Sequence, residues 1–358
     1  MSTENVVALL KSKFDISAAQ VEPLSSLSNQ VYKITTDDGA KYVFKMFSFK
    51  QNEIFRLHEQ HALRSSKIAD SYLYSDNLYR LERYIDNIEV AKADVISEPM
   101  SAFHMNCLAR FNRSNAIVSD KPNLFYVVER SKTRLLDIMA SNVAKLKDVA
   151  LRREMTTKLQ VINRVYEHYR QAAAPEALVL SHNDCYYRNF LFCAKERRLQ
   201  LIDFEFAGYN PLGMDVLGLY TSYIFANEAS EASRVSLCFD NLPSDAQFRR
   251  ILRFYLFFYK YGEAYDGAEH DEQMMRMVEA DNRFTEISDE EVNAILSRFG
   301  YYGALIEIFL IYWELYLCGS DESGFDYIGF AKLRYEILGF YMKRDGLDIK
   351  QFESQVGV

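Results

Sequence analysis

The sequence predicts an α+β chain in two parts, a small antiparallel sheet near the N-terminus and a large, mainly helical remainder. Runs rich in β-branched and aromatic residues, separated by short turn signals, occupy residues 30–84. After residue 86, apolar residues recur at helical spacing over long stretches. Gly and Pro, at 14 and 6 of the 358 residues, are both scarce, which favours long helices and short loops. We therefore expect two lobes, residues 1–85 and 86–358.

Within the first lobe, residues 1–14 predict a short amphipathic helix with Val6, Leu9 and Leu10 on one face. A small sheet with one further helix is expected to follow. The segment Asp37-Asp38-Gly39 is a hairpin turn signal between the first two strands of that sheet. The predicted elements are, in order, strands at 30–36 and 40–47, a helix at 50–66, and strands at 71–75 and 78–84.

The second lobe is expected to be built from long helices with one interruption. The helical stripes run over Pro99–Arg113, Thr133–Tyr169, Asp245–Tyr265, Asp289–Cys318 and Phe330–Lys343. Residues 178–206 break this pattern with two short apolar strands, 190–193 and 199–204, joined by a charged turn. A strand pair among helices holds its flanking loops rigidly, so we expect the chemistry of the protein there.

Charge and cysteine content narrow the function classes. The chain holds 42 Lys and Arg against 50 Asp and Glu, a net charge of -8, which argues against a nucleic-acid binder. Its five cysteines are scattered, without a CxxC pair, and indicate reduced thiols in a cytoplasmic protein. The N-terminal residues lack the pattern of a signal peptide. The most apolar run, Ile308–Trp313, is far shorter than the ~20 residues of a membrane span, so we expect no membrane insertion.

Polar residues at both ends of the predicted strand pair form a candidate site. The hairpin brings Asn189, just before its first strand, near Asp203, at the end of its second, and Asp184 lies on the preceding loop. An amide and a carboxylate supply the oxygen ligands that Mg²⁺ prefers. A second carboxylate can accept the proton of an attacking hydroxyl, as phosphoryl transfer from ATP requires. The competing structural interpretation is a loop aspartate and a buried strand-end aspartate.

A longer pattern surrounds these residues and is specific because both of its halves occur together. It consists of His182, Asn183, Asp184 and Asn189, followed by Ile202, Asp203, Phe204, Glu205, Phe206, Tyr209, Asn210 and Asp215. The pattern resembles the catalytic and metal-binding segments of the choline/ethanolamine kinase family, in the aminoglycoside-phosphotransferase-like group. The resemblance implies a bilobal protein-kinase-like fold, ATP and Mg²⁺ as cofactors, Asp184 as catalytic base, and Asn189 and Asp203 as metal ligands.

The same resemblance assigns nucleotide-binding roles in the first lobe. It places a phosphate loop before the strand at 30–36, a lysine on the phosphates with a glutamate partner, and a hinge whose backbone holds adenine. The matching residues are Ser28, Asn29, Lys45, Glu53, Arg83 and Ile85. The phosphate loop departs from the family, because no glycine precedes Gly39 and small polar residues stand there instead. For Lys45, an outward-facing strand lysine is the alternative interpretation.

In the family, aromatic side chains cage a quaternary ammonium, and ring faces do attract cations. Trp313 and Phe330 stand at matching positions, while Leu310 and Ser222 replace a second family tryptophan and a family glutamate. For most rings, a packed aromatic core is the simpler interpretation. The residues that the sequence offers for the pocket or for the missing charge are Glu205, Tyr209, Tyr220 and Glu314.

The resemblance therefore implies a kinase that phosphorylates choline or ethanolamine, with a product used in phospholipid biosynthesis. Its partner would be a small amino-alcohol, and a homodimer is allowed. One alternative is a kinase of the same fold acting on an aminoglycoside, a methylthio-sugar or thiamine. Another is a catalytically idle protein that binds a cation or a nucleotide. A protein kinase is disfavoured, because Glu205 follows Asp203-Phe204 where protein kinases have Gly.

Overall fold

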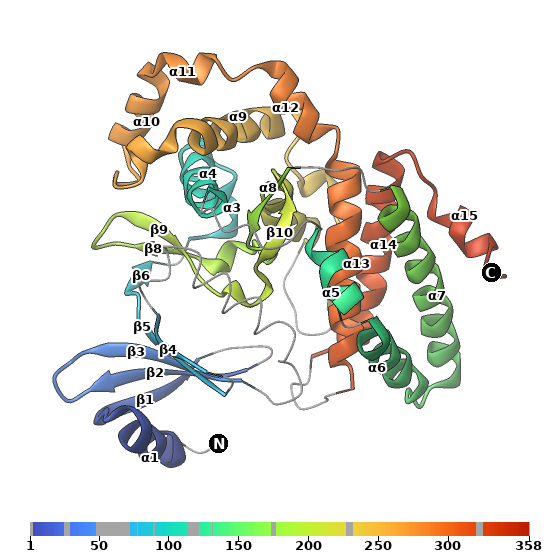
Figure 1. Ribbon diagram of the computed structural model, residues 1–358, viewed down its shortest axis with the longest axis horizontal. Helices are drawn as coiled ribbons and strands as arrows, with labels where there is room; N and C mark the ends of the chain where they lie inside the picture. Colours follow the sequence, from blue (N-terminus) through green and yellow to red (C-terminus); the bar gives the residue numbers. More distant parts are fainter. Residues whose placement is uncertain are drawn as a thin grey trace. The chain divides into compact units, whose positions relative to one another are not determined.

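The computed structural model describes residues 3–24, 29–47, 72–76, 78–88, 90–113, 122–130, 132–172, 177–226, 232–319 and 325–357. The chain separates into two compact units, Met1–Asp86 and Asn87–Val358. Figure 1 colours the elements of both units in chain order. The predicted helix at 50–66 lies outside the described residues.

The first unit is a five-stranded antiparallel sheet preceded by one helix. The helix is α1 (Thr3–Phe14), and the strands, in spatial order, are β1 (Ala18–Leu24), β2 (Gln30–Thr36), β3 (Lys41–Met46), β5 (Tyr79–Arg83) and β4 (Tyr72–Ser75). The helix predicted at residues 1–14 and the four predicted strands are confirmed, and β1 is an additional strand. Strand β1 escapes prediction because it contains Pro23 and has little β-branched character, which suits a sheet edge.

The two faces of this sheet differ in chemistry, because side chains alternate along each strand. Tyr32, Phe44 and Leu81 are partners across neighbouring strands and are buried on the face that packs with α1. The opposite face carries Lys45, which is paired in register with Val31 and Arg80. Lys45 is only 4% exposed, so it is not the outward-facing strand lysine of the alternative interpretation.

The second unit contains two small sheets. One sheet joins β6 (Asn87–Ile88), β8 (Phe190–Cys193) and β9 (Arg198–Leu201), and the other pairs β7 (Leu178–Ser181) with β10 (Gly208–Pro211). The predicted hairpin is therefore confirmed as β8–β9, but its second strand ends at Leu201 instead of residue 204. The strands β7 and β10 were not predicted.

Most other described residues of the second unit are helical. The helices are α3 (Lys92–Val95), α4 (Glu98–Asn112), α5 (Asn123–Arg130), α6 (Lys132–Ala144), α7 (Val149–Ala172), α8 (Met214–Thr221), α9 (Asp245–Tyr261), α10 (Glu272–Ala280), α11 (Asn282–Thr285), α12 (Asp289–Leu296), α13 (Phe299–Leu317), α14 (Tyr327–Arg344) and α15 (Ile349–Ser354). Figure 1 shows α13 and α14 running side by side, with extensive contact.

Two of the predicted long helices are wrong, because each is a pair of helices. Residues 133–169 are divided between α6 and α7, where the Asp148 side chain accepts a hydrogen bond from the backbone N–H of Leu151 at 3.0 Å and caps the new helix. Residues 289–318 are divided between α12 and α13 at Ser297-Arg298. An apolar stripe continues across such breaks, so periodicity alone does not reveal them.

One helical stretch among the described residues, Asp289–Leu317, is long and apolar enough to cross a membrane by length and composition. Of its most apolar window, 72% is buried within the structure, as expected for the core helix of a globular protein. All five cysteines are unpaired.

Asp76 connects α1 to the sheet of the first unit. Its carboxylate accepts hydrogen bonds from Lys13 on α1, from Tyr74, and from the backbone N–H groups of Leu78 and Tyr79. Burial raises the pKa of Asp76, but these hydrogen bonds outweigh burial and lower it to about 2. The carboxylate therefore stabilises the fold at pH values above the unfolded pKa of about 4, and this stabilisation is lost as the pH falls towards 2.

We predict that Asp76→Asn lowers the local stability of α1 and of the β4–β5 hairpin by about 1–2 kcal/mol at neutral pH, because the Lys13 partner and the charge are lost. Amide hydrogen exchange of these elements measures the change. The matched control is Asp15→Asn, which removes an exposed ion pair with Lys11 and should leave exchange unchanged. Equal effects of the two variants, or no loss of protection in wild type between pH 4 and pH 2, would contradict the assignment.

Candidate active site

The candidate site is built on the loop 182–189, which connects β7 to β8. Both flanking strands are held by antiparallel partners, β10 for the first and β9 for the second. Two backbone turns close the loop, with Tyr186 N–H donating to the Asp184 carbonyl and Asn189 N–H donating to the Tyr186 carbonyl, both at 2.8 Å. The loop is thus anchored at both ends and turned tightly between them.

The carboxylate of Asp215, near the start of α8, fixes the beginning of this loop. It accepts the backbone N–H of His182 at 2.8 Å and that of Asn183 at 3.0 Å, one on each oxygen. The Asn112 amide from α4 donates to it at 3.1 Å, and Asp215 is buried. The sequence pattern included Asp215, but this positioning role was not predicted from it.

Asn183 has a positive φ of 66°, a conformation that asparagine tolerates better than most residues. Its side chain is held from two sides. The Asn183 amide donates to the Phe206 carbonyl at 2.8 Å, and Asn183 Oδ1 accepts from the Asn210 amide on β10. The backbone after Asn183 is therefore directed by a network of amide side chains.

His182 braces the loop from inside the core. Its ring is fully buried and lies edge-on to the rings of Phe111 and Phe204, with centroid distances of 6.1 and 5.2 Å. His182 Nδ1 accepts the backbone N–H of Asp184 at 3.3 Å, so Nε2 carries the proton and donates to the Ile202 carbonyl at 2.7 Å. The imidazole thus connects the loop to the end of β9 and holds no free proton for chemistry.

The structure brings Asp184 and Asn189 together. The Asn189 amide nitrogen donates to both the carbonyl and Oδ2 of Asp184, each at 2.9 Å. Burial raises the pKa of the Asp184 carboxyl, and the negative charge of Asp203 raises it further, while His182 and Asn189 act in the opposite direction. The backbone N–H of Ile202 donates to the Asn189 carbonyl at 2.9 Å, so Asp203 directly follows the residue that is bonded to Asn189.

Asp203 lies two residues beyond the end of β9, and not at the end of the strand as predicted. It has left-handed backbone angles, φ 62° and ψ 63°, and begins the turn Phe204–Phe206. Aspartate, like asparagine, adopts such angles more readily than other residues with a Cβ, and these angles occur preferentially at functional sites. The strand prediction failed because the apolar run continues through Ile202 and Phe204, whereas the backbone reverses between them.

These residues fit the Mg²⁺ ion that the family resemblance implies. Because the Asn189 nitrogen makes both bonds to Asp184, its oxygen Oδ1 is the atom that the side chain offers to a metal. With the carboxylate of Asp203, it forms a set of hard oxygen donors suited to Mg²⁺. Within the described ranges, no three His, Cys, Asp or Glu side chains form a metal cluster, so the fit depends on this amide.

The other predicted site residues fall in several places. In the second unit, Glu205 is half-buried in the turn after Asp203, and Tyr209 is buried on β10 opposite Leu180. The Trp313 ring on α13 lies 4.9 Å from the Phe206 ring, and the Phe330 ring on α14 lies 6.1 Å from Phe225. The first unit holds four of these residues. Asn29 lies before β2, Lys45 lies in β3, Arg83 is exposed at the end of β5, and Ile85 follows that strand.

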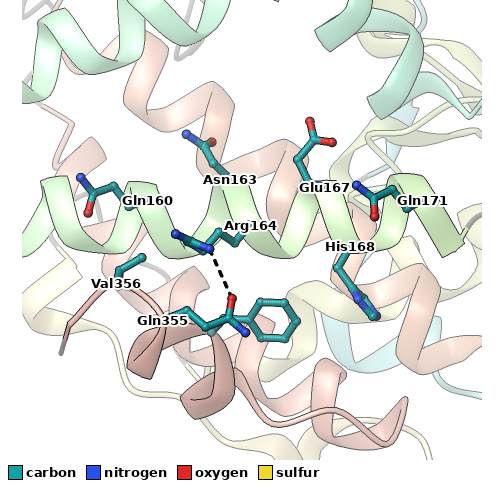
Figure 2. Close-up of a pocket in the computed structure, with 9 residues that line it drawn as sticks. Gln160, Asn163, Arg164, Glu167, His168, Gln171, Gln355 and Val356 are labelled. Atoms are coloured by element: carbon teal, nitrogen blue, oxygen red, sulfur yellow. Dashed lines mark hydrogen bonds between the residues drawn. The ribbon is translucent and has the colours of Figure 1, made fainter.

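Ser28 and Glu53 lie outside the described residues, so the phosphate loop and the partner of Lys45 stay predictions. A surface groove of about 810 Å³ lies elsewhere in the second unit, between α7 and α15. Figure 2 shows its polar lining, in which Arg164 donates to Gln355 at 3.4 Å. None of the predicted site residues lines this groove, so it is separate from the candidate site.

Solved structures with similar folds identify the fold of this chain. The choline kinase of Cryptosporidium parvum matches 99% of this chain and 98% of its own, with a TM-score of 0.62 at 14% identity. The Plasmodium vivax ethanolamine kinase matches 94% of this chain and 88% of its own, with a TM-score of 0.64 at 14% identity. The chain has the bilobal protein-kinase-like fold, as predicted.

The family follows from the sequence match. The model of the family described as choline/ethanolamine kinase matches residues 21–339, so the chain belongs to that family, as the resemblance implied. Human choline/ethanolamine kinase is 21% identical over 274 residues, and human ethanolamine kinase 1 is 24% identical over 215 residues. These matches cover 75% and 60% of this chain, but only 62% and 38% of the relatives.

We predict that Asp215→Asn destabilises the second unit by about 2–3 kcal/mol, because an amide nitrogen would then face backbone N–H donors in a buried position. Thermal unfolding of the full chain measures the effect. The control is Asp240→Asn, which changes an exposed aspartate and should leave the unfolding midpoint unchanged. A midpoint for Asp215→Asn equal to that of the control would show that the carboxylate does not hold the loop.

Proposed function

We propose that this protein is an ATP-dependent kinase that phosphorylates the hydroxyl group of an amino-alcohol, choline or ethanolamine. The observation that carries this proposal is the pair of hydrogen bonds from Asn189 to Asp184, with the Asn189 carbonyl bonded in turn to the backbone N–H of Ile202, the residue before Asp203. Family membership supports it, as do relatives named choline/ethanolamine kinase and ethanolamine kinase. We place the protein in the cytoplasm, because its cysteines are all unpaired.

In this proposal, Asp184 accepts the proton of the substrate hydroxyl as the oxygen attacks the γ-phosphorus of ATP. The new O–P bond forms while the bond from the γ-phosphorus to its bridging oxygen breaks, and ADP leaves. The hydrogen bonds from Asn189 and the turn within the loop fix the direction of the Asp184 carboxylate. Positioning of this kind is the main contribution that a protein makes to phosphoryl transfer.

Asn189 and Asp203 would hold Mg²⁺, which supplies charge neutralisation on the phosphates when bound. In the first unit, Lys45 provides the positive charge for the phosphates. Lys45 is buried on β3 and is paired in register with Arg80, which forms an ion pair with Glu82. The strand therefore fixes the position of the Lys45 charge. Asn29 and the hinge residues Arg83 and Ile85 complete the nucleotide contacts of this proposal.

The acceptor of the phosphoryl group is a cation in this proposal, and the aromatic side chains of Trp313 and Phe330 contribute to its pocket. The net charge of -8 favours approach of a positively charged substrate. The product, phosphocholine or phosphoethanolamine, would be consumed by reactions that build phospholipid head groups.

We predict that the wild-type protein converts ATP to ADP in the presence of Mg²⁺ and ethanolamine or choline, and that Asp184→Asn lowers kcat by about 10²- to 10⁴-fold, as expected on loss of a general base. ATP affinity should be retained, because the amide keeps the size of the side chain. A coupled ADP assay and ATP-binding calorimetry measure the two quantities. Asp240→Asn serves as the control with unchanged kcat.

Turnover by wild type on sugars or thiamine alone would reject the amino-alcohol as substrate. If the protein binds ATP but turns over none of these acceptors, it would instead be a binding protein that performs no catalysis.

We predict that chelation of divalent metal abolishes turnover and that added Mg²⁺ restores it. Asn189→Ala should raise the Mg²⁺ concentration needed for half-maximal rate by about tenfold or more, because one ligand and the brace on Asp184 are both lost. Asn241→Ala, at an exposed position, is the matched control. Full activity in excess chelator, or an Asn189→Ala variant with an unchanged Mg²⁺ requirement, would exclude this metal site.

A further inference from the structure

Asn123, the first residue of α5, lies outside the sequence pattern of the candidate site, yet it contacts two segments of that site. Its backbone N–H donates to the Asn210 side chain on β10 at 3.0 Å, and its own side-chain amide donates to the Phe206 carbonyl at 3.2 Å. Asn123 and Asn210 are each 2% exposed. Phe206 ends the turn that begins at Asp203, so α5 is bonded to the segment that carries a proposed metal ligand.

These contacts of Asn123 close a cycle of hydrogen bonds. The Asn210 amide nitrogen donates to Oδ1 of Asn183, and the Asn183 amide nitrogen donates to the Phe206 carbonyl at 2.8 Å. The Phe206 carbonyl thus accepts from both Asn183 and Asn123. We refer to Asn123, Asn183, Asn210 and the Phe206 carbonyl as the asparagine network.

The backbone groups of the asparagine network determine the direction of its amides. A backbone N–H can only donate, so Asn210 must present its oxygen to Asn123 and its nitrogen to Asn183. Asn183 then presents its nitrogen to the Phe206 carbonyl, which can only accept. The orientation of both amides therefore depends on where α5 places the backbone of Asn123.

The asparagine network joins the loop of Asp184 to the turn of Asp203. Ahead of Asp203, the backbone N–H of Ile202 donates to the Asn189 carbonyl on that loop at 2.9 Å. Beyond Asp203, the Phe206 carbonyl accepts from the asparagine network. The turn is thus bonded to the loop on both sides of its carboxylate, and the second connection includes α5.

Gly208 on β10 shows how closely this strand passes the Asn123 side chain. A Cβ placed on Gly208 would lie 2.6 Å from Cγ and 3.1 Å from Cβ of Asn123, closer than such atoms pack without a shift. Gly208→Ala would therefore push the Asn123 amide away from the Phe206 carbonyl. The hydrogen bond to that carbonyl requires both the amide of Asn123 and the missing side chain of Gly208.

We propose that Asn123 is a positioning residue for phosphoryl transfer, an inference that rests on the proposed function. Its side chain holds the turn of Asp203 against the loop of Asp184, so the metal ligand and the base keep a fixed separation. A misplacement of reacting groups by about 1 Å can lower a rate about 100-fold, so loss of this contact acts on kcat. ATP binding is retained, because the nucleotide-binding residues of the proposed function lie in the first unit.

Single and double substitutions at the two positions test this proposal. Asn123→Ala and Gly208→Ala should each lower kcat by about 10- to 100-fold and raise the Mg²⁺ concentration needed for half-maximal rate, with KM for ATP unchanged. The double variant should be no slower than Asn123→Ala alone, because Gly208→Ala then has no amide to displace. A coupled ADP assay measures these quantities, and thermal unfolding verifies that each variant is folded.

A second buried asparagine with a neighbouring glycine, in the same unit, provides the matched control. Asn142 on α6 is 8% exposed and donates to the carbonyls of Leu315 and Tyr316 at 3.2 and 2.9 Å. A Cβ on Gly319 would lie 2.6 Å from Cγ of Asn142, the same distance as in the first pair. Asn142→Ala and Gly319→Ala should therefore lower the unfolding midpoint, but leave kcat and the Mg²⁺ requirement unchanged.

Hydrogen exchange provides a readout that does not need turnover. The backbone N–H of Asp184 donates to His182 on the loop, and that of Ala207 donates to the Phe204 carbonyl in the turn. Both amides should exchange about tenfold faster in Asn123→Ala, because loop and turn open together, and at the wild-type rate in Asn142→Ala.

Loss of stability in Asn123→Ala without loss of kcat would overturn the proposal. Additive losses of kcat in the double variant, or equal losses in the control pair, would also overturn it. A wild type that forms no ADP would refute the proposed function, and exchange at Asp184 and Ala207 would then still decide whether Asn123 holds the turn against the loop.

Discussion

The site depends on one constraint, which is that a single buried carboxylate accepts hydrogen bonds from two consecutive backbone N–H groups. Asp215 binds the N–H groups of His182 and Asn183 with its two oxygens, and the Asn112 amide donates to it as well. Hydrogen bonds to a charged group contribute about 1.5–3 kcal/mol each. The two bonds fix the peptide planes that precede Asp184, so the direction of its side chain is set before any ligand binds.

A second layer of buried polar groups holds that carboxylate and its loop in place. The Asn112 amide donates to the Leu180 carbonyl at 2.7 Å as well as to Asp215, and its oxygen accepts from Tyr255 on α9 at 2.6 Å. The Asn123 backbone N–H, at the start of α5, donates to Asn210 at 3.0 Å. Helices from distant parts of the sequence thus converge on one loop through amide side chains, and these buried hydrogen bonds restrict the geometry of the loop.

The sequence allowed the hairpin and the convergence of Asp184 and Asn189 to be predicted, because both follow from local patterns. Asp203 was placed near them correctly, but its left-handed turn was missed. Strands β7 and β10 could not be predicted, since Leu178–Ser181 is too short for periodicity and Gly208–Pro211 has the composition of a turn. The ion pairs of Arg334 with Glu307 and Glu314 were also hidden, although Glu314 is among the residues that the sequence offers for the missing charge. Charged residues in a helical stripe normally face solvent, and the pairing of Arg334 with two α13 glutamates is a tertiary contact.

Hydrogen exchange at the amides of His182 and Asn183 in the intact protein tests this account most directly. If the Asp215 carboxylate holds both groups, they should exchange as slowly as the most protected amides of the buried helices, and at similar rates to each other, because one opening event releases both. Exchange at the rate of an exposed loop, or fast exchange at one amide only, would contradict the claim that this carboxylate sets the geometry of the site.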